Sequence, residues 1–153
     1  MDIQFSRLED LSAKLNTASD TISETLKRVE AKLAALRLGV EVWLSLEPLN
    51  TTPLTDSQGQ LQETISTYLG YAKVNGTWHI AVKNDEGDVL GGDNKVWPIH
   101  QAPRDERIAA LKRIPFLISA IEKKAEEELN EIQFALASVS VSTAPIVNTK
   151  PKP

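Results

Sequence analysis

Residues 69–82, LGYAKVNGTWHIAV, contain the clearest turn in the chain. Asn75 and Gly76 stand between two runs that are typical of β-strands. A type I′ turn needs positive φ at both central residues, and Asn followed by Gly adopts it at little cost. We therefore predict a two-residue hairpin that pairs Val74 with Thr77.

This register divides the hairpin into two faces. The mostly apolar face pairs Leu69 with Val82, Tyr71 with Ile80, and Lys73 with Trp78. The opposite face is predicted to be the more exposed one, and it consists of Tyr68, Gly70, Ala72, His79, Ala81 and Lys83.

Shorter segments surround the hairpin. Residues 40–49 alternate apolar and polar side chains and predict a half-buried strand. Residues 95–99 predict a short edge strand, where Pro98 is tolerated. Residues 50–67 are polar and contain a proline and a glycine, so we expect a long loop there. Residues 84–95 hold two clusters of Asp, Asn and Gly that indicate turns.

Residues 2–38 form the first of two helical segments. Their apolar positions recur at steps of three and four, the heptad spacing, at Leu8, Leu11, Leu15, Ala18, Ile22, Leu26, Val29, Leu33 and Leu36. No proline or glycine intervenes before Gly39, which favours a helix end there. The middle of the segment is rich in Ser and Thr, so the helix needs a partner surface to be stable.

The second helix is predicted to begin near Pro103, a favoured first-turn residue. Asp105 and Glu106 complement the positive end of the helix dipole. Its apolar stripe consists of Ile108, Leu111, Ile114, Ile118, Ile121, Ala125, Leu129, Ile132, Leu136 and Val139. Pro115 lies within the stripe and predicts a kink or a break.

These elements predict an α+β fold in which N-terminal and C-terminal amphipathic helices flank a small antiparallel β-sheet of three to four strands. Residues 1–142 would form one α-β-α domain with long coiled-coil-like helices. Residues 143–153 contain two Thr and three Pro, and we expect a flexible tail there.

Composition excludes several classes of function. The chain has no cysteine, so disulfides, thiolate metal sites and cysteine nucleophiles are excluded. The net charge of −4, without a basic stripe, argues against a nucleic-acid partner. No apolar run approaches the length that spans a bilayer, and no secretory signal is visible. We therefore expect no membrane association and a cytoplasmic location.

Few residues suggest chemistry. His79 and His100 are the only candidates for acid–base chemistry at neutral pH, and neither has a metal-type His partner nearby in sequence. The acidic cluster of residues 85–88 lacks the spacing of a calcium loop. We predict no catalytic residue, no cofactor and no metal site, and hence no enzyme.

Three further residues are candidate contacts. Trp43 lies on the polar side of its predicted strand, so it is either an exposed interface anchor or covered by a helix. Arg104 and Arg107, near the start of the second helix, predict an anion or ligand contact together with Trp97, although neighbouring carboxylates weaken this interpretation.

The heptad stripes predict function best. We expect a non-catalytic structural or protein–protein interaction module, an adaptor or an inhibitor-type binder, that forms a homodimer and binds a further protein. The expected interface consists of Leu8, Leu11, Leu15, Ile22, Leu26, Val29, Leu33, Leu36 and Trp43. The alternative is a small-ligand sensor with a pocket at the β-sheet, lined by Tyr71, Trp78 and Trp97.

Overall fold

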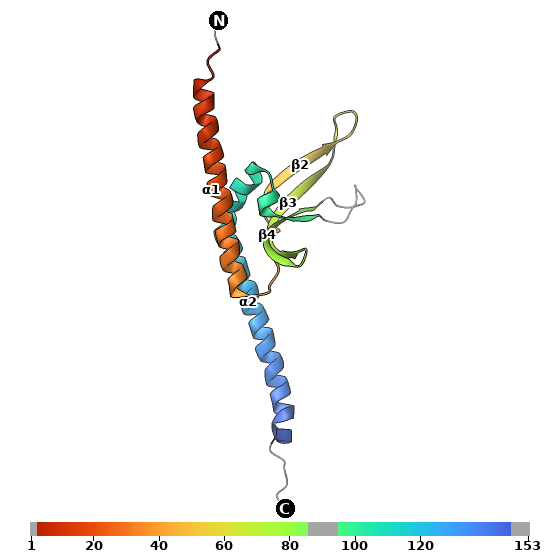
Figure 1. Ribbon diagram of the computed structural model, residues 1–153. Coiled ribbons are helices and arrows are strands. Elements are labelled where there is room, and N and C mark those ends of the chain that lie inside the picture. Colours follow the sequence, from red (N-terminus) through yellow and green to blue (C-terminus); the bar gives the residue numbers. More distant parts are fainter. Residues whose placement is uncertain (1–2, 86–94, 148–153) are drawn as a thin grey trace, which may run out of the picture.

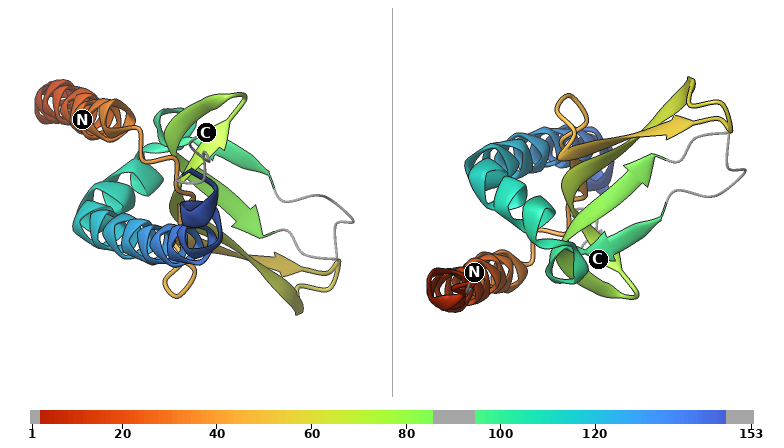
Figure 2. Two further views of the ribbon diagram at one scale, coloured as in Figure 1. Left: turned by 90° about the horizontal axis from the view of Figure 1, so that it is seen from below. Right: turned by 90° about the horizontal axis from the view of Figure 1, so that it is seen from above.

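The computed structural model describes residues 3–85 and 95–147 and has the predicted α+β architecture. In chain order its elements are α1 (Ser6–Leu36), β1 (Val42–Trp43), β2 (Asn50–Thr55), β3 (Leu61–Val74), β4 (Thr77–Asp85), β5 (Val96–Pro98), the 3-10 helix η1 (Ile99–Gln101) and α2 (Arg104–Val147). The two helices run in the same direction, and the sheet packs against one side of the pair (Figures 1 and 2).

The sheet has five strands, one more than the upper limit of our prediction. Its order is β1-β3-β4-β5, with β2 also paired to β3. All pairs are antiparallel. β5 lies at the edge beside β4, so the predicted edge strand that contains Pro98 is confirmed.

The predicted loop at residues 50–67 is wrong, because most of it forms the β2–β3 hairpin. The carboxylate of Asp56 makes the turn by accepting hydrogen bonds from the backbone N–H groups of Gln58 and Gln60, each at 2.9 Å. These bonds lower the pKa of Asp56. The hairpin projects away from the helices (Figure 1), and most of its side chains are exposed or half-buried. An alternating apolar pattern is therefore absent from its sequence.

The predicted strand at residues 40–49 is interrupted. Only Val42–Trp43 forms β1. The backbone returns to β3 where the N–H of Leu49 donates to the carbonyl of Thr67 at 2.6 Å. The predicted turns beyond Asp85 lie outside the described residues.

The register of the β3–β4 hairpin is confirmed, with Leu69 opposite Val82 and Tyr71 opposite Ile80. Asn75 and Gly76 have φ values of 51° and 85°, as the type I′ turn requires. The apolar face belongs to the hydrophobic core.

The opposite face of this hairpin, predicted to be the more exposed one, is partly covered: Ala72 and Ala81 are buried there, while Tyr68, His79 and Lys83 keep some exposure. Trp43 covers part of this face. Its ring lies so close to Gly70 that a Cβ at residue 70 would overlap both the ring and the carbonyl oxygen of Val42. The ammonium group of Lys83 lies 4.5 Å from the centre of the same ring. Trp43 therefore packs on the sheet, while its side chain keeps some exposure.

The core forms where the second half of α1 and the first half of α2 meet the sheet. Leu26 and Leu33 of α1 and the α2 residues Ala110, Ile114, Leu117 and Ile121 join Leu69, Tyr71, Ile80 and Val82 in one cluster. α2 stays continuous through Pro115, so no break occurs. Seen along its length, its first part curves around the sheet (Figure 2), as expected of a helix that lacks one backbone hydrogen bond.

α2 also continues to Val147, so residues 143–147 of the segment expected as a tail are helical. Residues 148–153 lie outside the described part of the chain.

We predict that Gly70→Ala lowers the free energy of unfolding by about 1–3 kcal/mol, the usual cost of overpacking a filled site. Chemical denaturation measures this loss. The loss should become smaller in a Trp43→Ala background, because the substitution removes the ring that the new methyl group meets. Equal losses in both backgrounds would contradict this packing.

Candidate interaction surface

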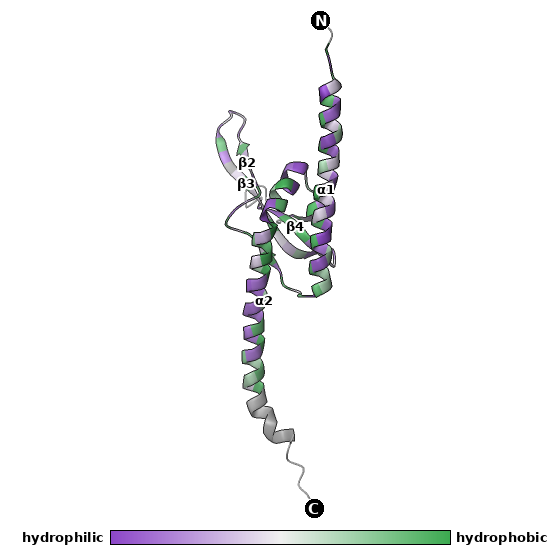
Figure 3. Ribbon diagram, turned by 90° about the vertical axis from the view of Figure 1, so that its left-hand side faces the viewer, coloured by the Kyte–Doolittle hydropathy of each residue, from purple (hydrophilic) through white to green (hydrophobic). Residues whose placement is uncertain are grey.

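The helices overlap over only part of their length, and each extends past the body at the opposite end (Figures 1 and 3). We call residues 6–18 the α1 overhang and residues 126–147 the α2 overhang. All residues from 6 to 18 are exposed, whereas Ser19, Leu26 and Leu33 further along α1 are buried. The α1 core face therefore continues into the overhang without cover.

The expected interface residues of α1 fall into two groups. Leu26 and Leu33 are buried in the core, and Ile22 and Val29 pack against it. Leu8, Leu11 and Leu15 are between 44% and 60% exposed, and Leu36 is also exposed. Only the second group is available to another molecule in this structure.

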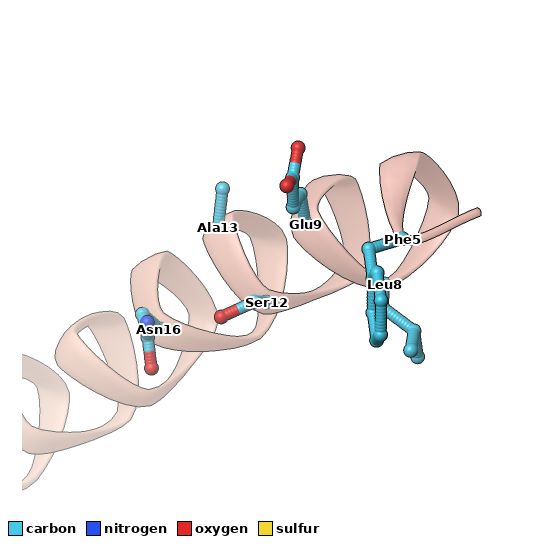
Figure 4. Close-up of a pocket in the computed structure, with 6 residues that line it drawn as sticks. All are labelled: Phe5, Leu8, Glu9, Ser12, Ala13 and Asn16. Atoms are coloured by element: carbon cyan, nitrogen blue, oxygen red, sulfur yellow. The ribbon is translucent and has the colours of Figure 1, made fainter. Parts of the chain in front are cut away.

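The close-up of the α1 overhang shows how its side chains lie (Figure 4). Phe5 and Leu8 point to the same side of the helix, and Glu9 and Ala13 point to a different side. Phe5 is 56% exposed, so it extends the apolar strip beyond the residues identified from the heptad pattern.

α2 shows the same division. Ile121 is its last buried residue among the side chains described, which extend to Val139. Further along the stripe, Leu129, Ile132 and Leu136 are between 52% and 62% exposed, and Val139 is exposed as well. Apolar and polar residues alternate along the α1 overhang and along the coloured part of the α2 overhang (Figure 3), which is typical of helices that pack on a partner.

Arg107 sets the level at which the helices meet. Its Nη1 donates to the carbonyl of Ser19 at 3.3 Å and to Oγ of Ser23, and its Nη2 donates to Oγ of Ser19 at 3.0 Å. The guanidinium predicted to contact an anion is thus bonded to α1. An additional anion contact there, with Arg104 and Trp97, stays a prediction. Trp97 pairs with Val82 and packs against the core.

Glu30 joins α1 to the sheet. Its Oε1 accepts the backbone N–H of Ile80 at 2.8 Å and lies 3.1 Å from Nδ1 of His79. The ring of His100 is 5.9 Å from that of His79. His79, predicted to be on the open surface, is therefore half-buried in a contact between elements.

Glu106 is a buried carboxyl group in the first turn of α2. Burial raises its pKa, and so does the negative charge of Asp105, while a side-chain hydrogen bond with Asn50 opposes the rise. Its Oε2 has no hydrogen-bond partner in the described structure. The fold therefore disfavours ionisation of Glu106 compared with a carboxyl group in water.

An open groove of about 480 Å³ lies between the segment after β1 and α2. Its lining includes Trp43, Leu46, Arg113 and Phe116. Arg113 holds the segment in place by donating to the carbonyl of Glu47 at 2.7 Å. Phe116 was not identified from the sequence as a candidate site residue. The signal that could have identified it is that an apolar residue lies outside the apolar stripe of α2.

The three aromatic rings expected to line a ligand pocket pack in the hydrophobic core or against it. Tyr71 is buried and stacks on Trp78 with 5.3 Å between ring centres. Burial raises the pKa of Tyr71, and the charge of Glu30 adds to this rise.

Comparison with known proteins gives no assignment: no family model, no curated protein and no solved structure matches this chain. Among residues 3–85 and 95–147, no three His, Asp or Glu side chains are grouped to hold a metal ion. None of the described helices is both long and apolar enough to cross a membrane.

We expect Arg107→Lys to lower the free energy of unfolding by about 1–2 kcal/mol, because one ammonium group cannot reach all three acceptors. Arg104→Lys, one turn earlier on α2, should leave stability within about 0.5 kcal/mol of the wild type. Similar losses for both variants in urea unfolding would argue against the bridge to α1.

Glu106→Gln should stabilise the fold relative to wild type at pH 7 more than at pH 4. A carboxyl group whose folded-state pKa is raised contributes stability below its unfolded pKa and loses it as the pH rises through the folded pKa. The amide cannot ionise, so the variant escapes this loss. Urea unfolding at the two pH values measures this difference. A gain that does not depend on pH would contradict it.

Proposed function

We propose that this protein is a non-catalytic interaction module that assembles with a second copy of itself through the two overhangs. The observation that supports this most is the continuity of the helix faces. The face of α1 that packs in the core at Leu26 and Leu33 continues to Leu15, Leu11 and Leu8 outside the body. A monomer gains no packing from leucines at heptad spacing where no other part of the described chain covers them.

The energetics favour a partner on these faces. The α1 overhang contains Ser12, Asn16 and Thr17, which are poor helix formers, and its length is close to that at which an isolated helix is marginal in water. Burying its leucines against another helix would stabilise both the overhang and the complex. A different protein with a matching helix is the further partner that such a surface would accept.

The groove beside Trp43 is the feature that favours the alternative, a small-ligand sensor. It is lined by residues of the β1–β2 segment and α2, whereas the expected set of Tyr71, Trp78 and Trp97 packs in or against the core. The overhangs are the larger and more regular feature, so we place the function there.

Leu11→Asp is the direct test of self-assembly. Leu11 is exposed in the single copy, so the variant should stay folded. Burying an unpaired carboxylate in a helix interface costs about 3 kcal/mol or more, which weakens association by more than about 100-fold. Light scattering coupled to size-exclusion chromatography measures the change.

Thr17→Asp is the matched control, because it adds the same charge to an exposed position on the opposite side of the helix. The double variant His79→Ala with His100→Ala should also keep the assembly. A wild-type chain that stays monomeric at the highest concentrations, or a Leu11→Asp variant that assembles normally, would remove the basis for this proposal.

A further inference from the structure

The overhangs have the same apolar spacing. Leu8, Leu11 and Leu15 are separated by three and four residues, and Leu129, Ile132 and Leu136 repeat those steps. We propose that the α1 overhang of one copy packs in parallel on the α2 overhang of a second copy, so that copies join head to tail. This inference rests on the proposed self-assembly and specifies which surfaces meet.

Continuity with the packing inside one copy is the first argument. Within a copy, the start of α2 meets the middle of α1 at the Arg107 bridge. Both helices point the same way (Figure 1), and part of the sheet lies between them further along (Figure 3). α1 ends at Leu36, where Arg37 adopts a left-handed conformation, and α2 continues beyond this level with its stripe exposed. If one copy is shifted along the helix axis of the second copy, its α1 overhang lies on the exposed α2 stripe of the second copy. The two helices then run in parallel.

The lengths are compatible with this shift. The α1 overhang has 13 residues, from 6 to 18, and the α2 overhang has 22, from 126 to 147. At 1.5 Å per residue these correspond to roughly 20 Å and 33 Å. The α1 overhang is therefore shorter than the α2 overhang, and its whole length can lie along the exposed part of α2.

Charge selects this pairing over self-pairing of α2. The α2 overhang carries Glu126, Glu127, Glu128 and Glu131 and no basic residue, a net charge of −4. Two such overhangs side by side would bring eight carboxylates together (four from each copy), which is unfavourable.

The charges of the α1 overhang are compatible with packing on the acidic α2 overhang. Its charged residues are Arg7, Glu9, Asp10 and Lys14, so its net charge is zero. Arg7 and Lys14 are seven residues apart, and each precedes a stripe leucine, so both flank one edge of the stripe. The ion pair of Lys14 with Asp10 is exposed on both sides and holds Lys14 weakly. Both cations can therefore turn toward the carboxylates of α2.

Complementation of two variants tests the inference. Leu11→Asp disables the α1 stripe and leaves the α2 stripe intact, and Ile132→Asp does the reverse. We expect each variant alone to be monomeric and the equimolar mixture to form a one-to-one heterodimer that grows no further. The wild type should grow beyond a dimer as its concentration is raised. Sedimentation velocity resolves these species, and circular dichroism confirms that the variants keep their helix content.

The outcomes separate this inference from the proposed function. A wild type that never associates overturns both. If Ile132→Asp alone dimerises like the wild type while Leu11→Asp does not, the α1 overhangs pair symmetrically, and only the head-to-tail arrangement fails. A mixture that stays monomeric also overturns the head-to-tail arrangement alone.

Energy transfer provides a second measurement. The chain has no cysteine, so Ser6→Cys in the Ile132→Asp variant and Gln133→Cys in the Leu11→Asp variant each accept a single dye. The head-to-tail pair brings the labelled overhangs side by side and should give strong transfer in the mixture. Absence of transfer in a mixture that associates would overturn the inference.

Discussion

The bridge from Arg107 to Ser19 and Ser23 fixes where the two helices meet. A guanidinium stays charged at any physiological pH, so when it is largely buried it must find acceptors nearby. The acceptors here lie on α1 one turn apart, and Arg107 lies in the first turns of α2. The start of α2 is thereby held level with the middle of α1. This offset between the two helices leaves one end of each helix uncovered, and these uncovered ends are the two overhangs.

The offset divides each helix into a part stabilised by packing and a part that depends on its own propensity. Both overhangs mix strong helix formers (Leu, Ala, Glu) with weak ones (Asn, Ser, Thr). Neither overhang packs on another part of the described structure, so each would gain stability from a partner. Association and helix stability are coupled there.

Local turn chemistry made the β3–β4 hairpin predictable, since Asn75 and Gly76 determine both the turn and the register. The β2–β3 hairpin was not predictable in the same way. Its strands are solvated on both faces, so they lack the alternation by which strands are recognised, and its turn depends on the Asp56 side chain. The burial of Ala72 and Ala81 was also hidden from the sequence. So was the close approach of Trp43, whose ring reaches Gly70 from a strand 27 residues earlier in the chain.

The heptad pattern identified the correct face of α1 but not which turns of that face are covered. Spacing is a property of one helix, whereas cover depends on where the neighbouring helix begins and ends. Here α2 begins after Pro103 and α1 ends before Gly39, and neither boundary reveals the offset between the helices without Arg107. Leu11 and Leu26 therefore look equivalent in the sequence, although one is exposed and the other is buried. That difference separates residues that hold the fold from residues available to a second copy.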